Sequence, residues 1–178
     1  VRPRLLLLLD VSRSMSLYSF FYLRLARALC AELADVHCFI FHTRITGVAE
    51  ALRDPDPWRS QERMHLLAAG WAGGTRIGEC LRDFNRDHAA RLVHSRTGVI
   101  IVSDGYDTGE PELLAQALAA LRRRSRRLVW LNPLLNQPGF SPESRGMQAA
   151  LPHIDLLAPG ADLAGLERVL PQIIEALR

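Results

Sequence analysis

Oxygen-bearing side chains stand at alternate positions directly after a short apolar run near the start of the chain. Residues 5–9 are all leucine, and residues 10–14 read Asp-Val-Ser-Arg-Ser. An all-apolar run of this length is typical of a central strand in a parallel sheet. Side chains of an extended segment alternate in direction, so Asp10, Ser12 and Ser14 can face the same side. We therefore expect three oxygen ligands together at the end of a strand.

Two later segments carry the same kind of side chain. Thr75 follows two glycines, whose missing side chains let a backbone approach closely. Asp104 comes shortly after another apolar run, residues 99–102. Carboxylate and hydroxyl oxygens without nitrogen or sulfur suit Mg²⁺, Mn²⁺ or Ca²⁺, and suit zinc or copper poorly. The predicted metal ligands are Asp10, Ser12, Ser14, Thr75 and Asp104.

Each of these residues also has a purely structural explanation. Ser14 or Ser16 could cap the helix that follows, Thr75 could cap the next one, and an aspartate at a strand end could satisfy loop amides. Their joint occurrence at two strand ends and one glycine-rich loop favours the metal site. Arg13 and Arg76 lie inside two of these loops, where they either bind an acidic partner or are ordinary surface arginines.

Alternating strands and helices must position these loops. The patterns predict strands at residues 5–9, 37–41, 45–48, 99–102, 128–131 and 154–157. They predict helices at residues 17–33, 60–69, 77–92, 110–123, 145–150 and 163–177, the last of them kinked by Pro171. This alternation indicates an α/β fold, a doubly wound and mostly parallel central sheet flanked by helices on both faces. Such sheets bind ligands beyond the carboxyl ends of their strands, where the strand order reverses.

The composition excludes several classes of chemistry. The chain has 178 residues, the length of one domain, and its 22 basic residues are all arginine. Without lysine there is no phosphate-binding P-loop, no Schiff-base catalysis and no protein kinase site. The five-residue run of leucines is far too short for a membrane span.

Two further patterns have structural explanations. Five arginines lie between residues 122 and 127, and we expect a solvated helix C-terminus there rather than a nucleic-acid site, because no aromatic residues are interleaved with them. The three cysteines, Cys30, Cys38 and Cys80, lack the spacing of a zinc site or a disulfide framework. They are typical of a protein of the reducing cytoplasm.

The motif residues resemble those of a known family. Residues 10–14, Thr75 and Asp104 look like the complete metal-ion-dependent adhesion site (MIDAS) of von Willebrand factor A (VWA) domains. Residues 73–78, 103–109, 130–133 and 146–147 are similar to the bacterial CoxE-like group. The resemblance implies a Rossmann-like VWA domain spanning residues 1–178, cut from a longer protein with a helical region before it. It also implies that Ser12, Ser14 and Thr75 coordinate the metal directly, whereas Asp10 and Asp104 do so directly or through water.

The resemblance carries an expectation about function. It implies a cytoplasmic, non-enzymatic interaction module that works with a MoxR-type AAA+ ATPase in maturing a metalloenzyme, such as a molybdenum hydroxylase. An acidic side chain of the ATPase or client would then complete the coordination of Mg²⁺. A metal-dependent phosphoester hydrolase using the same oxygen cluster is the alternative, but no Asp-x-Asp pair and no G-x-S-x-G segment supports it. An RNA-binding A domain ranks last.

Overall fold

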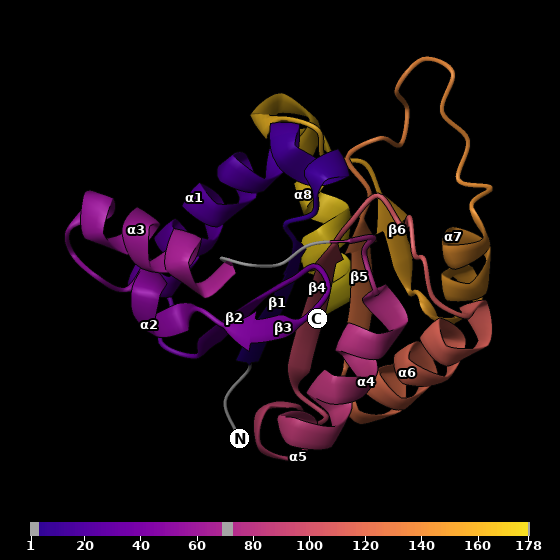
Figure 1. The fold of residues 1–178 in the computed structure, drawn as a ribbon, viewed down its shortest axis with the longest axis horizontal. Coiled ribbons are helices and arrows are strands. Elements are labelled where there is room, and N and C mark those ends of the chain that lie inside the picture. The colour runs from indigo at the N-terminus through magenta and orange to yellow at the C-terminus, as the bar shows by residue number, and fades with distance from the viewer. Residues whose placement is uncertain (1–3, 69–72, 178) are drawn as a thin grey trace.

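A single six-stranded sheet forms the centre of the protein. The computed structural model describes residues 4–68 and 73–177 (Figure 1). The strands are β1 (Arg4–Asp10), β2 (Val36–Phe41), β3 (Ile45–Gly47), β4 (Thr97–Val102), β5 (Arg127–Leu131) and β6 (Leu156–Ala158). Their order is β3-β2-β1-β4-β5-β6, and of the neighbouring pairs only β2–β3 is antiparallel. The predicted α/β fold with a mostly parallel sheet is confirmed.

Helices cover both faces of this sheet. They are α1 (Ser16–Glu32), α2 (Ala49–Leu52), α3 (Pro57–Ala68), α4 (Ile77–Asp87), α5 (Ala89–Leu92), α6 (Pro111–Arg124), α7 (Arg145–Ala150) and α8 (Leu163–Leu177). Two 3₁₀ turns are η1 (Arg13–Met15) and η2 (Leu151–His153). One core cluster joins the sheet to α4, α6 and α7, and the other joins it to α1, α2, α3 and α8. Figure 1 shows these two groups of helices on opposite sides of the strands.

The leucine run of β1 contributes to both clusters. Leu6 and Leu8 belong to the cluster under α4 and α6, whereas Leu7 and Leu9 belong to the cluster under α1. This alternation follows from the two-residue period of a strand that is buried on both faces. The next side chain along the strand is Asp10, which therefore lies at the carboxyl edge of the sheet.

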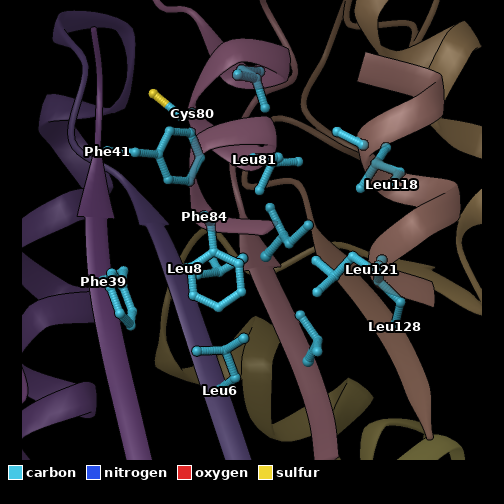
Figure 2. Close-up of a cluster of buried hydrophobic side chains, with 14 of the residues drawn as sticks. Leu6, Leu8, Phe39, Phe41, Cys80, Leu81, Phe84, Leu118, Leu121 and Leu128 are labelled. Carbon is cyan, nitrogen blue, oxygen red and sulfur yellow. The ribbon is translucent and has the colours of Figure 1, made fainter. Parts of the chain in front are cut away.

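The loop that precedes α4 is held in position because α4 packs closely against the sheet and against α6. Phe84 of α4 meets Phe39 of β2 edge-on, with ring centroids 5.0 Å apart (Figure 2). Gly78 lies so close to α6 that an added Cβ would be 2.8 Å from the backbone nitrogen of Leu114. Burying each large side chain of this cluster contributes about 1.5–3 kcal/mol, so the start of α4 is firmly held.

Strand order reverses between β1 and β4. From β1 the chain passes through α1 to β2 on one side, and from β4 it passes through α6 to β5 on the other side. The loops after these two adjacent strands therefore lead away in opposite directions. In parallel sheets such a divergence leaves a crevice between the loops, at the carboxyl ends of the strands. Asp10 ends β1, and Asp104 follows β4 by two residues. The predicted ligands therefore lie at the topological switch point.

The predicted helix over residues 77–92 is wrong in one respect, because it is broken. It ends at Asp87 as α4, and α5 begins at Ala89. The residue between them, His88, has non-helical backbone angles. Its ring packs on Phe39, with centroids 4.9 Å apart. Tertiary packing of this histidine competes with continuation of the helix, which the amphipathic pattern alone does not reveal.

Other boundaries differ by a few residues. The helix expected at residues 60–69 begins earlier, at Pro57, and residue 69 lies outside the described residues. The short helix α2 was not predicted, and β6 begins two residues later than expected. Pro171 lies inside α8, where the expected kink stays a prediction.

The arginine run lies far from the switch point along the strands. Its first three residues form the last turn of α6, and its last residue, Arg127, begins β5 at the amino edge of the sheet. Arg122 forms an ion pair with Asp155 at 2.6 Å, and Ser125 N donates to the helical carbonyl of Leu121. The predicted helix C-terminus is confirmed.

Within residues 4–68 and 73–177 no helix has the length and apolar character of a membrane span.

Replacing Gly78 by alanine tests the close approach of α4 and α6. The new Cβ would overlap the α6 backbone, and overpacking of this kind costs about 1–3 kcal/mol, which exceeds the gain in helix propensity of up to about 1 kcal/mol. We expect Gly78→Ala to lower the free energy of unfolding by about 1–2 kcal/mol in urea denaturation. Gln116→Ala, on the exposed face of α6, serves as the control and should change it by less than about 0.5 kcal/mol. An unchanged midpoint for Gly78→Ala would contradict the packing described.

Candidate metal centre

The loop after β1 brings two hydroxyl oxygens together. Ser12 N donates to Asp10 Oδ1 at 2.9 Å, and Met15 N donates to the carbonyl oxygen of Ser12 at 3.0 Å. Ser12 Oγ and Ser14 Oγ are 3.2 Å apart. The prediction that the Ser12 and Ser14 oxygens lie together is confirmed, but the extended conformation from which it was predicted is wrong. The segment is not extended, because residues from Arg13 onward form the 3₁₀ turn η1.

Asp10 is enclosed at the end of its strand. Its side chain is 1% exposed, and Oδ2 accepts a hydrogen bond from Ser103 Oγ at 2.6 Å. The Ser103 hydroxyl in turn accepts from Gly105 N at 3.0 Å. This residue ties the end of β1 to the loop after β4. Ser103 was not predicted as a site residue, because its position beside Asp104 is the only signal that the sequence carries for it.

Asp104 is buried to the same extent, and one of its oxygens lacks a partner. Oδ1 accepts from Tyr106 N at 3.2 Å, whereas Oδ2 is buried and accepts no hydrogen bond within the described part of the chain. Asn132, which is fully buried, donates from Nδ2 to the backbone oxygen of Asp104 at 3.2 Å and so holds this residue in place. An unpartnered buried carboxylate oxygen carries a desolvation cost, which a bound cation would offset.

The loop that carries Thr75 is clamped by the segment after Asp104. The carbonyl oxygen of Thr75 accepts from Thr108 N and from Thr108 Oγ1, both at 2.9 Å. The neighbouring Gly74 leaves room for the same threonine, since an added Cβ would lie 2.2 Å from Thr108 Cγ2. On the other side, Arg76 N donates to the carbonyl oxygen of His42, one residue beyond the end of β2.

Asp107 completes this clamp. Its Oδ1 accepts from Ile77 N at 3.0 Å and from Gly109 N at 3.1 Å, so it links the first residue of α4 to the loop after β4. The hydroxyl of Thr75 makes no hydrogen bond with the described residues, although the side chain is nearly buried. That oxygen is therefore available as a ligand at the same edge of the sheet as Asp10.

The site holds two buried carboxylates without a buried cation of the chain. Burial raises the pKa of Asp10 to about 6, against the hydrogen bonds from Ser103 and Ser12, and the nearby charge of Asp104 adds to the rise. Burial also raises the pKa of Asp104, against the hydroxyl of Ser14 and the amide of Tyr106. A divalent cation would stabilise both ionised carboxylates, so the residues present fit such an ion.

The donor set is made of oxygen. The described residues contain no group of three or more His, Cys, Asp or Glu side chains arranged to hold a metal. A metal at this edge would therefore depend on two carboxylates and three hydroxyls, a combination that suits hard cations such as Mg²⁺.

The two predicted partner-binding arginines lie at the rim. Both side chains are exposed. Arg76 Nη1 lies 3.4 Å from Glu79 Oε2, an exposed pair of the kind that contributes little to stability. Arg13 forms no ion pair with the described residues. Neither arginine pairs with Asp10 or Asp104, so their role toward a partner stays a prediction.

Comparison with known proteins identifies the family. Residues 1–166 match the model of a family described as VWA domain containing CoxE-like protein. A search of curated protein sequences gives no match.

Solved structures share the fold at low identity. BatB from Bacteroides thetaiotaomicron has a TM-score of 0.57 and 16% identity, covering 99% of this chain and 98% of that one. A von Willebrand factor type A protein from Catenulispora acidiphila has a TM-score of 0.61 and 16% identity, covering 99% and 43% of the two chains. Proximal thread matrix protein 1 from the mussel byssus, with a zinc-occupied MIDAS motif, has a TM-score of 0.53 and 13% identity, covering 98% and 48%.

Burial of Asp10 predicts how the stability of the metal-free protein depends on pH. Burial raises its folded pKa from the ordinary aspartate value of about 4 to about 6, so the folded state binds more protons between about pH 4 and pH 6. The contribution of this group to stability therefore falls as pH rises through that window. In EDTA, we expect Asp10→Asn to lose this fall and to be more stable than the wild type at pH 7, as measured by urea denaturation from pH 4.5 to 7.5.

Asp87→Asn is the matched control for that series. Arg86 lowers the pKa of Asp87, so its contribution to stability is lost as pH falls, the opposite sign. Equal pH slopes for Asp10→Asn and the wild type would show that Asp10 is not buried as described.

Proposed function

The chain belongs to the family of VWA domain containing CoxE-like proteins, and from that premise we propose that it is a metal-dependent protein-interaction module without catalytic activity of its own. The observation that carries the proposal is the buried, unpartnered Oδ2 of Asp104 beside the enclosed carboxylate of Asp10. Two charges confined at a strand edge, with hydroxyl oxygens around them, form a cation site rather than a structural cap.

The bound ion is proposed to be Mg²⁺, with Mn²⁺ or Ca²⁺ as substitutes. The ligands would be Asp10, Ser12, Ser14, Thr75 and Asp104. All-oxygen donors favour these hard cations. The zinc reported in the MIDAS motif of the mussel protein supports a divalent ion at this position of the fold. When bound, the ion would supply a coordination position for an oxygen of a partner's Asp or Glu side chain.

Some residues of the chain would hold the ion, and others form a rim that would contact the partner. Asp10 and Asp104 are enclosed and cannot reach a partner, and Ser103 keeps the Asp10 carboxylate in place. Arg13 and Arg76, exposed on the loops around them, are placed to form charge-assisted hydrogen bonds with an acidic group. The rim therefore suits a partner that presents a carboxylate.

Family membership suggests the biological setting. We propose that the partner is a MoxR-type AAA+ ATPase in the cytoplasm, and that the pair matures or remodels a metalloenzyme client such as a molybdenum hydroxylase. An acidic side chain of either protein can fill the rim. His42, the histidine next to the site, contacts it through its backbone oxygen, so this residue gives the hydrolase alternative no support as a general base. An RNA-binding role has no cluster of arginines at the site to support it. The arginine run lies at the opposite edge of the sheet, where its last residue, Arg127, begins β5.

A binding measurement tests this proposal. Surface plasmon resonance with the MoxR-type ATPase of the same genome should show binding in Mg²⁺ that weakens at least about tenfold in EDTA, since a metal–carboxylate contact is lost. Ser12→Ala and Asp104→Asn should weaken it similarly in Mg²⁺, whereas Asp87→Asn, an exposed carboxyl elsewhere, should not. Affinity that is the same in Mg²⁺ and EDTA would refute a metal-dependent contact. Metal-dependent turnover in a phosphoesterase screen, lost in Asp104→Asn, would refute the non-enzymatic assignment.

A further inference from the structure

Helices α1 and α3 border a groove on the outside of the molecule, away from the metal ligands. Its volume is about 540 Å³, and its lining is mainly apolar. The apolar lining includes Phe20, Leu23 and Ala28 of α1, Leu52 of α2, and Pro57 and Met64 of α3. Figure 1 shows α3 standing outside the helix layer, next to α1. We call this feature the α1–α3 groove.

The outer face of α1 carries large apolar side chains although it does not face the sheet. Tyr22, Ala26 and Cys30 form the buried face. On the outside, Leu17 is 84% exposed and Phe20 is 56% exposed. A surface helix normally carries polar residues opposite its buried stripe, and a helix that is apolar around most of its circumference is covered on both sides. The composition of α1 therefore indicates a second packing partner.

Helix α3 adds further exposed apolar area. Trp58 is 81% exposed and Leu66 is 70% exposed, and among the described residues of α3 only Ser60 and Met64 are buried. Large apolar side chains thus gather on the two helices that border the groove. Trp58 and Leu66 do not line the groove itself, so the contact surface proposed below is the apolar lining of the groove, with the exposed Phe20 at its edge.

The polar part of the groove has one sign of charge. Arg24 and Arg27 line it, and neither pairs with a carboxylate among the described residues. The Arg24 guanidinium lies over the Phe20 ring, 5.8 Å from its centroid. Arg27 donates to two backbone carbonyls, of Leu52 at 3.4 Å and of Pro55 at 3.3 Å. The groove therefore combines an apolar floor with uncompensated positive charge.

We propose that the α1–α3 groove binds an amphipathic helix of a partner protein, with an apolar stripe flanked by Asp and Glu residues. A groove between two helices accepts the apolar face of a third, with anchors at i, i+3 or i+4, and i+7. Acidic flanks would pair with Arg24. Among the described residues the groove is lined by no carboxylate, so an isologous groove-to-groove contact with a second copy would supply no acidic partner for Arg24. The groove uses none of the metal ligands, so this binding does not require the metal.

Fluorescence anisotropy with a designed peptide tests the proposal. The probe is a labelled helix of about 18 residues with leucines at helical spacing and glutamates beside them, compared with the same peptide carrying lysines in place of the glutamates. The acidic peptide should bind at least about tenfold more tightly. Phe20→Ser and Arg24→Glu should each weaken it about tenfold, because one removes an apolar anchor and the other reverses the charge.

Controls separate this proposal from the metal-dependent one. Arg126→Glu, an exposed arginine at the amino edge of the sheet, should leave peptide binding unchanged, and so should EDTA and Asp10→Asn. Circular dichroism confirms that the variants are folded. Equal affinity for acidic and basic peptides, or for wild type and both groove variants, would overturn the proposal. So would a concentration-dependent dimer in sedimentation that Phe20→Ser abolishes, since the occupant would then be a second copy.

Discussion

The rest of the site depends on the burial of two carboxylates at the point where the strand order reverses. Asp10 and Asp104 are each 1% exposed, and burial raises the pKa of both. Ionised carboxylates in such a position are costly unless hydrogen bonds and a counter-charge accompany them. The surrounding residues supply hydrogen bonds to three of the four carboxylate oxygens and leave Asp104 Oδ2 without one. That imbalance is the basis on which we propose a cation site at this edge.

The fold serves this arrangement in specific ways. Apolar strands buried on both faces deliver Asp10 and Asp104 to one edge, and in β1 only leucines lie between Arg4 and Asp10. Gly78 lets α4 approach α6, and Asp107 and Thr108 then hold the Thr75 loop from the far side. Three segments distant in sequence therefore meet at the edge. The apolar groove on α1 and α3 uses different residues from the metal ligands, so the two proposed contacts lie at chemically distinct places.

Sequence patterns predicted the strands and the strand-end aspartates well, because an apolar run that stops at a carboxylate reports burial directly. They missed Ser103 and Asn132, whose roles come from contacts with residues 93 and 28 positions away, respectively. Long-range hydrogen bonds of this kind leave no periodic signal. The break at His88 and the 3₁₀ turn after Ser12 were missed because local packing competes there with the simplest helix or strand. The α1–α3 groove was not predicted either, because the sequence does not show which apolar residues of α1 face the sheet and which face outward.

The central claim is that the orphaned oxygen of Asp104 belongs to a cation site. The most direct test is a crystal grown in Mn²⁺, with anomalous diffraction data collected at the manganese edge. We predict an anomalous peak within coordination distance of the Asp104 side chain or of a water bound to it, with Ser12 Oγ and Ser14 Oγ among its ligands at about 2.0–2.3 Å. The same experiment on Asp104→Asn should lose the peak. Absence of a peak in the wild type at millimolar Mn²⁺, or a peak at surface carboxylates alone, would contradict the account.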